Sequence, residues 1–373
     1  MKDIRLEKLA NLIINYSVKV QPEDYVFIIC DEVASPFMIE AAKAAVIAGG
    51  LVETILNNQE VAETKLKYGN HKQITQKNFL METVIKKADV LITAWGGRNT
   101  KINANIDAEK MKSKALSDKA WRKIFSKRMG DGSLRWIGTQ FPTHSDAQEA
   151  NMSLSDYEAF VYGAGLLDTE DPAAEWEKIS ASQEQWVQYL DRKKELHILS
   201  EDTDLKVCID GRKWQNCDGR LNFPDGEVYT SPVDDKINGV ISFSFPGIYA
   251  GKEIEGIKME IVDGLVKTAT AKKGEDLLKA LLSTDEGSNR FGEVAIGTNY
   301  GIQKFTRNML FDEKIGGTIH MALGDSMPEA GGVNRSAIHW DMLCDMREGG
   351  QIYADGELFH ENGTFVESVL NKK

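Results

Sequence analysis

Strand-like and helix-like segments alternate along the first half of the chain, and this order constrains the fold more than any other feature of the sequence. A β-rich run at Tyr25–Cys30 is followed by a helical stretch and then by a second strand-like run at Leu51–Leu56. Ser35, as a candidate cap, and Pro36 indicate where that helix begins, and Gly49–Gly50 indicates where it stops. Strand–helix–strand order favours a parallel sheet with right-handed crossovers.

Further segments extend this alternation towards residue 141. We expect a helix over residues 78–88, a buried strand over Asp89–Gly97 and another strand over Leu134–Phe141. The turn after the first strand reads CDEVASP and contains no GxGxxG motif. A dinucleotide-binding site in this half therefore has no support in the sequence.

A helical segment rich in Trp, Glu and Lys covers residues 153–195. One face of this segment would carry Trp176, Ile179, Trp186 and Leu190. The aromatic residues at these positions are typical of packing against a sheet rather than of ligand binding.

Strand signals dominate after Leu196, interrupted by one helix over residues 274–287. The sequence VDGLV between two of these strands is typical of a hairpin turn. We expect a parallel-sheet α/β domain with a helical end over residues 1–200. An α+β metal-binding domain is expected over residues 201–373.

Composition and charge exclude some classes of function. The formal net charge of −12 argues against nucleic acid as the main partner, because phosphate binding requires a basic surface, but it suits a metal ion. No apolar run approaches the roughly 18 residues that span a bilayer, and the N-terminal residues lack the features of a signal peptide. The four cysteines lack metal-type spacing, which suits a reducing compartment. We therefore expect a cytoplasmic protein that contacts no membrane.

Two histidines and three carboxylates of the second half enter strand-like runs. His320 and His339 are 19 residues apart, and Asp341 follows His339 with one residue between them. Because residues i and i+2 of a strand point to one face, His339 and Asp341 should lie side by side. Glu227 and Glu293 each stand at the start of another β-prone run. Burying such charges is costly unless they are paired or metal-bound, and mixed nitrogen and oxygen ligands suit Zn²⁺, Co²⁺ or Mn²⁺.

Each of these residues also has a purely structural interpretation. His320 alone is more typical of a hydrogen-bonded core histidine than of a ligand. The pair His339 and Asp341 is as consistent with a local hydrogen bond as with a metal site. Glu227 and Glu293 alone would be surface residues at strand ends. Spacing alone therefore suggests a metal site without deciding it.

Longer motifs around these positions carry a resemblance to a known family. The stretches NFPDGEVYTSP, KGEDLLKALLSTDEG, FGEVAIGTN, LFDEKIGGTIHMALG and NRSAIHWDML are similar to motifs of the aminopeptidase T (thermophilic metallopeptidase) family. The resemblance is specific over Leu221–Phe365. It implies a two-domain α/β protein that dimerises and holds two metal ions in its C-terminal domain. The ligands that it implies are Glu227, Glu293, His320, His339 and Asp341.

The resemblance also implies an activity. The chain would be a metalloaminopeptidase, a leucyl-aminopeptidase-like hydrolase that releases N-terminal residues from short peptides with two divalent ions (Zn, Co or Mn) per chain. Water activated by the two ions would attack the peptide bond, and a carboxylate would carry its proton to the leaving amine. Glu293 is the first choice for this general base, and Glu227 is the other. Arg307 and Arg335 are candidates either for stabilising the oxyanion or for simple salt bridges.

Two departures from the family pattern bear on substrate range and activity. Many members have a tyrosine shortly after the ALG motif, where this chain has Met327. The loop EAGGVN before His339 is also shorter than in many members. Loss of the phenol would remove a hydrogen bond in the transition state, and a shorter loop would reshape the substrate pocket.

Two other functions remain open at this point. His320, His339 and Asp341 form a two-histidine, one-carboxylate set, the ligand type of non-haem Fe(II) oxygenases, and ring-cleaving dioxygenases that resemble aminopeptidase T exist on this fold. A single iron does not need Glu227 and Glu293, so these two residues favour the peptidase. The third possibility is a metal-binding homologue with weakened catalysis.

Overall fold

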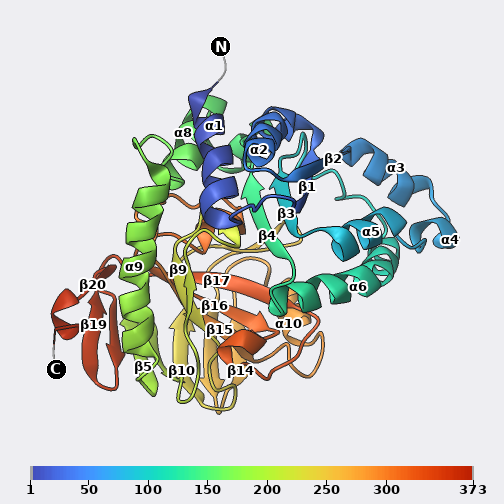
Figure 1. Cartoon of the computed structure of the whole chain (residues 1–373). Helices are drawn as coiled ribbons and strands as arrows, with labels where there is room; N and C mark the ends of the chain where they lie inside the picture. The colour runs from blue at the N-terminus through green and yellow to red at the C-terminus, as the bar shows by residue number, and fades with distance from the viewer. Residues whose placement is uncertain (1–2, 372–373) are drawn as a thin grey trace. The chain divides into compact units, whose positions relative to one another are not determined.

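The structure is a computed structural model that describes residues 3–371. Grouped by their internal contacts, these residues form two compact units (Figure 1). The first unit runs to residue 173 and also includes residues 219–224, and the second contains residues 174–218 and the chain from residue 225 onward. The units differ from the expected division at residue 200 in two ways. Residues 174–200 group with the second unit, and the short strand at Asn222–Phe223 belongs to the first unit.

A five-stranded parallel sheet in the order β2-β1-β3-β4-β8 forms the centre of the first unit. Its strands are β1 (Tyr25–Asp31), β2 (Leu51–Asn57), β3 (Val90–Trp95), β4 (Arg135–Gln140) and β8 (Asn222–Phe223). β1 and β3 are largely buried, as expected for near-continuous apolar runs in a parallel sheet that is covered on both faces. The predicted parallel-sheet domain is therefore confirmed.

One helix precedes the first strand of this sheet, and further helices lie between or after its strands. They are α1 (Ile4–Leu12), α2 (Ser35–Ile47), α3 (Gln59–Tyr68), α4 (His71–Ile74), α5 (Phe79–Lys87), α6 (Ala108–Gly130), α7 (His144–Glu149) and α8 (Leu154–Ala164). α2 begins at Ser35 itself, after a 3₁₀ turn at Glu32–Ala34, so Ser35 is not its cap. Gly49 adopts φ +91° just beyond the end of α2, a conformation that glycine adopts without strain.

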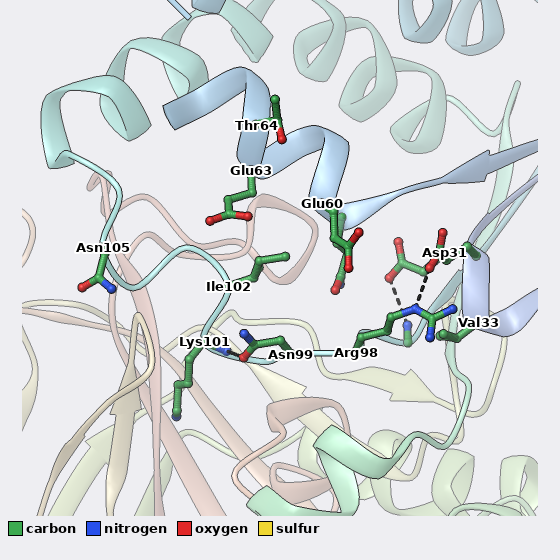
Figure 2. A pocket seen from close by; sticks show the side chains of 13 residues that line it. Asp31, Val33, Glu60, Glu63, Thr64, Arg98, Asn99, Lys101, Ile102 and Asn105 are labelled. Atoms are coloured by element: carbon green, nitrogen blue, oxygen red, sulfur yellow. Dashed lines mark hydrogen bonds and ion pairs between the residues drawn. The ribbon is translucent and has the colours of Figure 1, made fainter. Parts of the chain in front are cut away.

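A polar cavity of about 480 Å³ lies at the carboxyl ends of β1 and β3 (Figure 2). The chain leaves β1 in opposite directions to reach β2 and β3, and open α/β sheets commonly bind ligands at such a switch point. Arg98 forms an ion pair with Glu32 at 2.6 Å, while Glu60 and Glu63 reach the cavity from α3. Among residues 3–371, however, the clusters of potential metal ligands all lie in the second unit.

The second unit contains two large antiparallel sheets and a two-stranded ribbon (Figure 1). One sheet has the order β14-β13-β10-β6-β5-β18-β19-β20, and the other has the order β17-β16-β15-β9-β7. The strands of the first are β5 (Glu195–Ser200), β6 (Thr203–Cys208), β10 (Ile237–Ser242), β13 (Lys258–Val262), β14 (Leu265–Thr270), β18 (Gln351–Ala354), β19 (Glu357–Glu361) and β20 (Thr364–Phe365). Those of the second are β7 (Gln215–Cys217), β9 (Glu227–Thr230), β15 (Phe291–Gly297), β16 (Thr318–Gly324) and β17 (His339–Asp345). The ribbon pairs β11 (Gly247–Tyr249) with β12 (Lys252–Ile254).

The helices of this unit are α9 (Pro172–Leu190), which begins at the end of the first unit, α10 (Glu275–Leu282) and α11 (Met309–Asp312). Trp176 is fully buried, and the ring of Trp186 stacks on Phe365 at 4.3 Å between centroids. The predicted packing role of these aromatic residues is confirmed. Nowhere in the described part of the chain does a helix combine the length and apolar character needed to cross a bilayer.

The predicted hairpin is also confirmed, because β13 and β14 pair on either side of Asp263 and Gly264. Both residues have positive φ, as a two-residue turn of type I′ requires. One hydrophobic core contains residues of both large sheets, α9 and α10. This core packs against one face of the antiparallel five-stranded sheet, β17-β16-β15-β9-β7.

His360 of β19 is a polar residue inside this packed region. It is fully buried, and in the described structure neither ring nitrogen has a hydrogen-bond partner. The ring lies edge-on to Phe365 at 5.2 Å between centroids. Burial lowers the pKa of His360 to about 4, so the ring is neutral at physiological pH.

We expect His360 to make the unfolding free energy depend on pH. Its folded pKa lies below the roughly 6.5 of an unfolded histidine, so its contribution is complete above that value and is lost as the pH falls towards 4. Between about pH 7.5 and about pH 5 the loss should be about 2 kcal/mol. Urea unfolding of His360→Leu should lack this part of the pH dependence. His197→Leu, at a half-exposed histidine of β5, is the control and should behave like wild type, whereas an unchanged pH profile in His360→Leu would contradict the prediction.

Candidate metal centre

The five predicted ligands lie on four neighbouring strands of the antiparallel five-stranded sheet of the second unit. Glu227 is on β9, Glu293 is on β15, His320 is on β16, and His339 and Asp341 are on β17. Ala322 of β16 is the cross-strand partner of both Glu293 and Asp341. Cross-strand partners share a face, and so does His320, which precedes Ala322 by two residues. The register therefore brings all of these side chains to one face of the sheet.

The remaining two residues follow the same rule. Glu227 pairs with Gly297, which is four residues beyond Glu293 on β15, and His339 pairs with Gly324, which is two residues beyond Ala322 on β16. The alternate residues of these strands, such as Ile319 and Met321, belong to the hydrophobic core. The period of two in the sequence thus separates a polar face from an apolar one.

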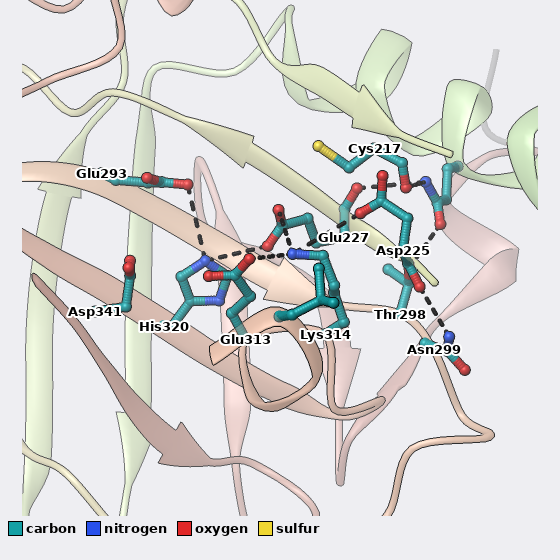
Figure 3. A network of polar contacts seen from close by, with 12 residues as sticks. Cys217, Asp225, Glu227, Glu293, Thr298, Asn299, Glu313, Lys314, His320 and Asp341 are labelled. Atoms are coloured by element: carbon teal, nitrogen blue, oxygen red, sulfur yellow. Dashed lines mark hydrogen bonds and ion pairs between the residues drawn. The ribbon is translucent and has the colours of Figure 1, made fainter. Parts of the chain in front are cut away.

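Glu293 lies between the two histidines, with one oxygen directed at each ring. His320 Nε2 is 3.8 Å from Glu293 Oε1, and His339 Nε2 is 3.1 Å from Glu293 Oε2. A second carboxylate approaches the same nitrogen of each ring: Glu227 Oε2 is 3.2 Å from His320 Nε2, and Asp341 Oδ1 is 3.7 Å from His339 Nε2. Figure 3 shows the row from Glu293 through His320 to Glu227, with Asp341 beside it.

Burial and mutual charge shift the pKa values of these groups. Burial alone would lower the pKa of both histidines, but the neighbouring carboxylates raise it to about 9 for His320 and about 10 for His339. Burial would raise the pKa of Glu293, but hydrogen bonds from the two rings hold it below its ordinary value. For Glu227 and Asp341, burial dominates and raises the pKa. Without a metal ion, the cluster therefore retains protons that a cation would displace.

Three buried polar atoms of the cluster lack a hydrogen-bond partner among the described residues: Glu227 Oε2, His320 Nδ1 and Asp341 Oδ1. An unsatisfied buried acceptor costs roughly 1–3 kcal/mol, which coordination to a cation would remove. Carboxylate and imidazole atoms within 4.8 Å of one another form two groups here, Glu293–His339–Asp341 and Glu313–His320–Asp341. The donor set fits a divalent ion of the zinc, cobalt or manganese type.

The sequence alone did not identify four residues of this region: Cys217, Asp225, Glu313 and Lys314. Glu313 directly follows α11, and it joins His320 and Asp341 in one of the two groups of potential ligands. A third group contains Cys217, Asp225 and Glu227, and Lys314 contacts its carboxylates. The available signal was a charged pair, Glu313–Lys314, placed between the apolar run of α11 and the strand that carries His320.

The two predicted arginines lie in ion pairs of their own. Arg307 Nε is 3.2 Å from Glu253 Oε1, and Arg335 is 3.7 Å from Asp325 Oδ1. The backbone carbonyl of Asp325 in turn lies 2.8 Å from His339 Nδ1 and accepts its hydrogen bond when that nitrogen is protonated. Arg335 is thus linked to the cluster through the residue that orients His339.

Met327, at the position where family members often have a tyrosine, packs against Tyr229 and Ala295. Tyr229 is two residues beyond Glu227 on β9 and shares its face of the sheet. The hydroxyl of Tyr229 donates a hydrogen bond to Glu329 at 2.9 Å. A phenol is therefore present beside the cluster on a different strand, with its hydrogen bond directed at a carboxylate.

Comparison with known proteins is consistent with this geometry. Residues 2–365 match the model of the thermophilic metalloprotease (M29) family. Aminopeptidase 2 of Geobacillus stearothermophilus is 25% identical over 379 residues, covering 91% of each chain. Aminopeptidase T of Thermus thermophilus is 27% identical over 398 residues, covering 96% of this chain and 95% of its own.

Two solved structures share the fold. Wild-type AmpT from Thermus thermophilus superposes with a TM-score of 0.86 at 24% identity, over 98% of this chain and all of its own. A 2,5-dihydroxypyridine dioxygenase from Pseudomonas putida KT2440 has a TM-score of 0.62 at 13% identity, over the whole of both chains. The predicted fold class and the predicted family are therefore confirmed. The chain belongs to the thermophilic metalloprotease (M29) family and is a metallopeptidase.

Proposed function

We propose that this metallopeptidase is an aminopeptidase that removes the N-terminal residue of short peptides with two divalent ions, of zinc, cobalt or manganese. The observation that carries the proposal is the place of Glu293 between His320 and His339 on one face of a sheet. A carboxylate with one oxygen towards each of two imidazoles could act as a ligand together with either of them. The names of the relatives, aminopeptidases of similar length, supply the reaction class.

We assign Glu293 to both of two ligand sets, and we place Asp341, which belongs to both groups of potential ligands, with His339. Glu227, Glu313 and His320 would hold one ion with Glu293, and His339 and Asp341 would hold the other. When bound, the two ions would supply Lewis-acid chemistry, lowering the pKa of a water molecule and polarising the scissile carbonyl. This assignment keeps all five ligands expected from the sequence and adds Glu313.

The charge balance of the cluster supports two ions rather than one. Among the described residues, the cluster contains one ammonium group, that of Lys314, and five buried or half-buried carboxylates: Asp225, Glu227, Glu293, Glu313 and Asp341. Two divalent ions together with Lys314 and neutral histidines would neutralise them. One divalent ion would leave buried negative charge that only protons could offset.

Proton transfer to the leaving amine requires a carboxylate that can reach the substrate. Glu293 was the first choice from the sequence, but its contacts with both histidines suit a ligand and compete with that role. The side chain of Glu313 is 18% exposed, against 5% for Glu293. Glu293 and Glu227 are therefore kept as ligands, and Glu313 is the carboxylate of the cluster that can best reach the substrate.

The dioxygenase function has weaker support. A mononuclear iron site needs His320, His339 and Asp341 around one ion. Here the two rings approach opposite oxygens of Glu293, and each has a further carboxylate beside it. The dioxygenase neighbour shares the fold at 13% identity, and a shared fold does not carry the chemistry with it. The predicted homodimer and the predicted cytoplasmic location remain predictions.

Replacing His339 or Asp341 by Ala should lower metal affinity at least roughly tenfold, because each removes a ligand atom and even residues behind the ligands contribute this much. Elemental analysis after dialysis measures the bound metal, and circular dichroism checks the fold. His197 and Asp204 form a matched exposed pair at 2.7 Å on β5 and β6, and their Ala variants should retain full metal. Full metal in both His339→Ala and Asp341→Ala would mean that the ions bind elsewhere.

Glu227→Gln should bind one ion as wild type does and the second much more weakly, because the amide carries no charge. Titration of metal-free protein with Zn²⁺ or Mn²⁺, followed by calorimetry and peptide hydrolysis, measures stoichiometry and activity together. Glu260→Gln, on the exposed side of β13, is the control. Activity that saturates at one equivalent and is unchanged in Glu227→Gln would exclude the two-ion mechanism.

Hydrolysis should require a free α-amine on the substrate. A site that binds the amine through a carboxylate or an ion gives no stabilisation to an acetylated end, so kcat/KM for N-acetyl-Leu peptides should fall by orders of magnitude relative to Leu peptides. Chromatography of the released residues gives both rates. Equal turnover of the two substrates would rule out an aminopeptidase and leave an endopeptidase.

A further inference from the structure

Lys314 is a lysine whose side chain is completely buried inside the acidic cluster. It directly follows Glu313, and its exposed fraction is 0%. Its Nζ is 3.3 Å from Glu227 Oε1 and 3.8 Å from Asp225 Oδ1, and it forms an ion pair with Glu313 Oε1 (Figure 3). Three carboxylates from two segments, residues 225–227 and the residue directly before Lys314, thus converge on one ammonium group.

A buried ammonium is very costly unless its charge and its donors are matched. Lys314 has three N–H donors, and hydrogen bonds to Glu227 and Glu313 use two of them. The interior contains this charge because the neighbouring carboxylates would otherwise be uncompensated. Lys314 is therefore a built component of the cluster and not a solvated surface residue.

The contacts of Lys314 determine how Glu227 faces the rest of the site. Glu227 Oε1 accepts from Lys314, while Glu227 Oε2 lies 3.2 Å from His320 Nε2 and has no hydrogen-bond partner among residues 3–371. One oxygen is thus held and the other is left directed at the histidine. The same division applies to Glu313, whose Oε1 is held by Lys314 and which joins His320 in a group of potential ligands.

We propose that Lys314 is a positioning residue of the metal centre, which holds one oxygen of Glu227 and one of Glu313 so that their other oxygens and His320 form the site of one ion. This proposal rests on the proposed function, because it takes Glu227, Glu313 and His320 as ligands. It assigns Lys314 no contact with the substrate. Within the described structure, the hydrogen bonds and ion pairs of Lys314 go to Asp225, Glu227 and Glu313 and not to Glu293, His339 or Asp341.

The test compares Lys314→Met with wild type during titration of metal-free protein with Co²⁺. Calorimetry gives the affinity of each ion, and the visible absorption of Co²⁺ reports its coordination. In Lys314→Met one ion should bind at least roughly tenfold more weakly with an altered spectrum, and the other should bind as in wild type. Lys267→Met removes an exposed lysine of β14 and should change neither. Wild-type affinity and spectrum in Lys314→Met would overturn the proposal.

A second variant separates positioning from simple charge balance and covers the case in which Lys314→Met does not fold. Lys314→Met combined with Asp225→Asn removes one positive and one negative charge, so the net charge of the cluster is unchanged. If Lys314 positions Glu227 and Glu313, the weak ion remains weak in the double variant. If the double variant recovers wild-type affinity and spectrum, Lys314 only balances charge and the proposal is wrong.

The titration of wild-type protein distinguishes a failure of the proposal for Lys314 from a failure of the proposed function. Two equivalents with aminopeptidase activity support the two-ion function, whatever Lys314 does. A single equivalent would count against that function. Lys314→Met would then still decide the role of Lys314, because weaker binding of that ion supports it and unchanged binding overturns it.

Discussion

The structure of the second unit depends on how it accommodates carboxylates on a buried sheet face. Glu227, Glu293 and Asp341 are each less than about a tenth exposed, where an uncompensated charge costs several kcal/mol. The register of β9, β15, β16 and β17 sets these groups beside His320 and His339, so that two carboxylates approach the Nε2 atom of each ring. The sheet can bury the cluster only because cations, whether protons, Lys314 or metal ions, neutralise it.

This requirement connects folding with chemistry. The opposite face of the same strands packs Ile319, Met321 and their neighbours into the main core, which fixes the backbone behind the polar residues. Ligands on rigid strands are held more accurately than ligands on loops. Glu313 and Lys314 are the exception, since they follow a single helical turn, and their contacts with Glu227 and His320 tie that segment to the sheet. The more adjustable part of the centre is therefore the part that contains Glu313.

A peptidase and a dioxygenase can share this fold because the fold determines where residues lie and not which residues they are. In this chain Glu227 and Glu313, which lie beside His320, and Lys314, which contacts both, favour the proposed peptidase. Glu227 and Glu313 supply negative charge for which a single iron has no use. The first unit contributes a separate polar cavity at the ends of β1 and β3, where Arg98 and Glu32 pair with each other.

The sequence alone determined the alternating first sheet and the hairpin at Asp263–Gly264, because these follow from local periodicity and turn chemistry. For the five residues of the polar face, spacing only suggested a metal site, and the resemblance to a known family supplied the set. The sequence did not reveal α6, a long polar helix without an apolar stripe, or the return of residues 219–224 to the first sheet. Only the tertiary structure could place Glu313 and Lys314 beside Glu227, which lies 87 residues from Lys314 in the chain. Such contacts are decided by strand register and loop path, and one sequence does not encode them in any local pattern.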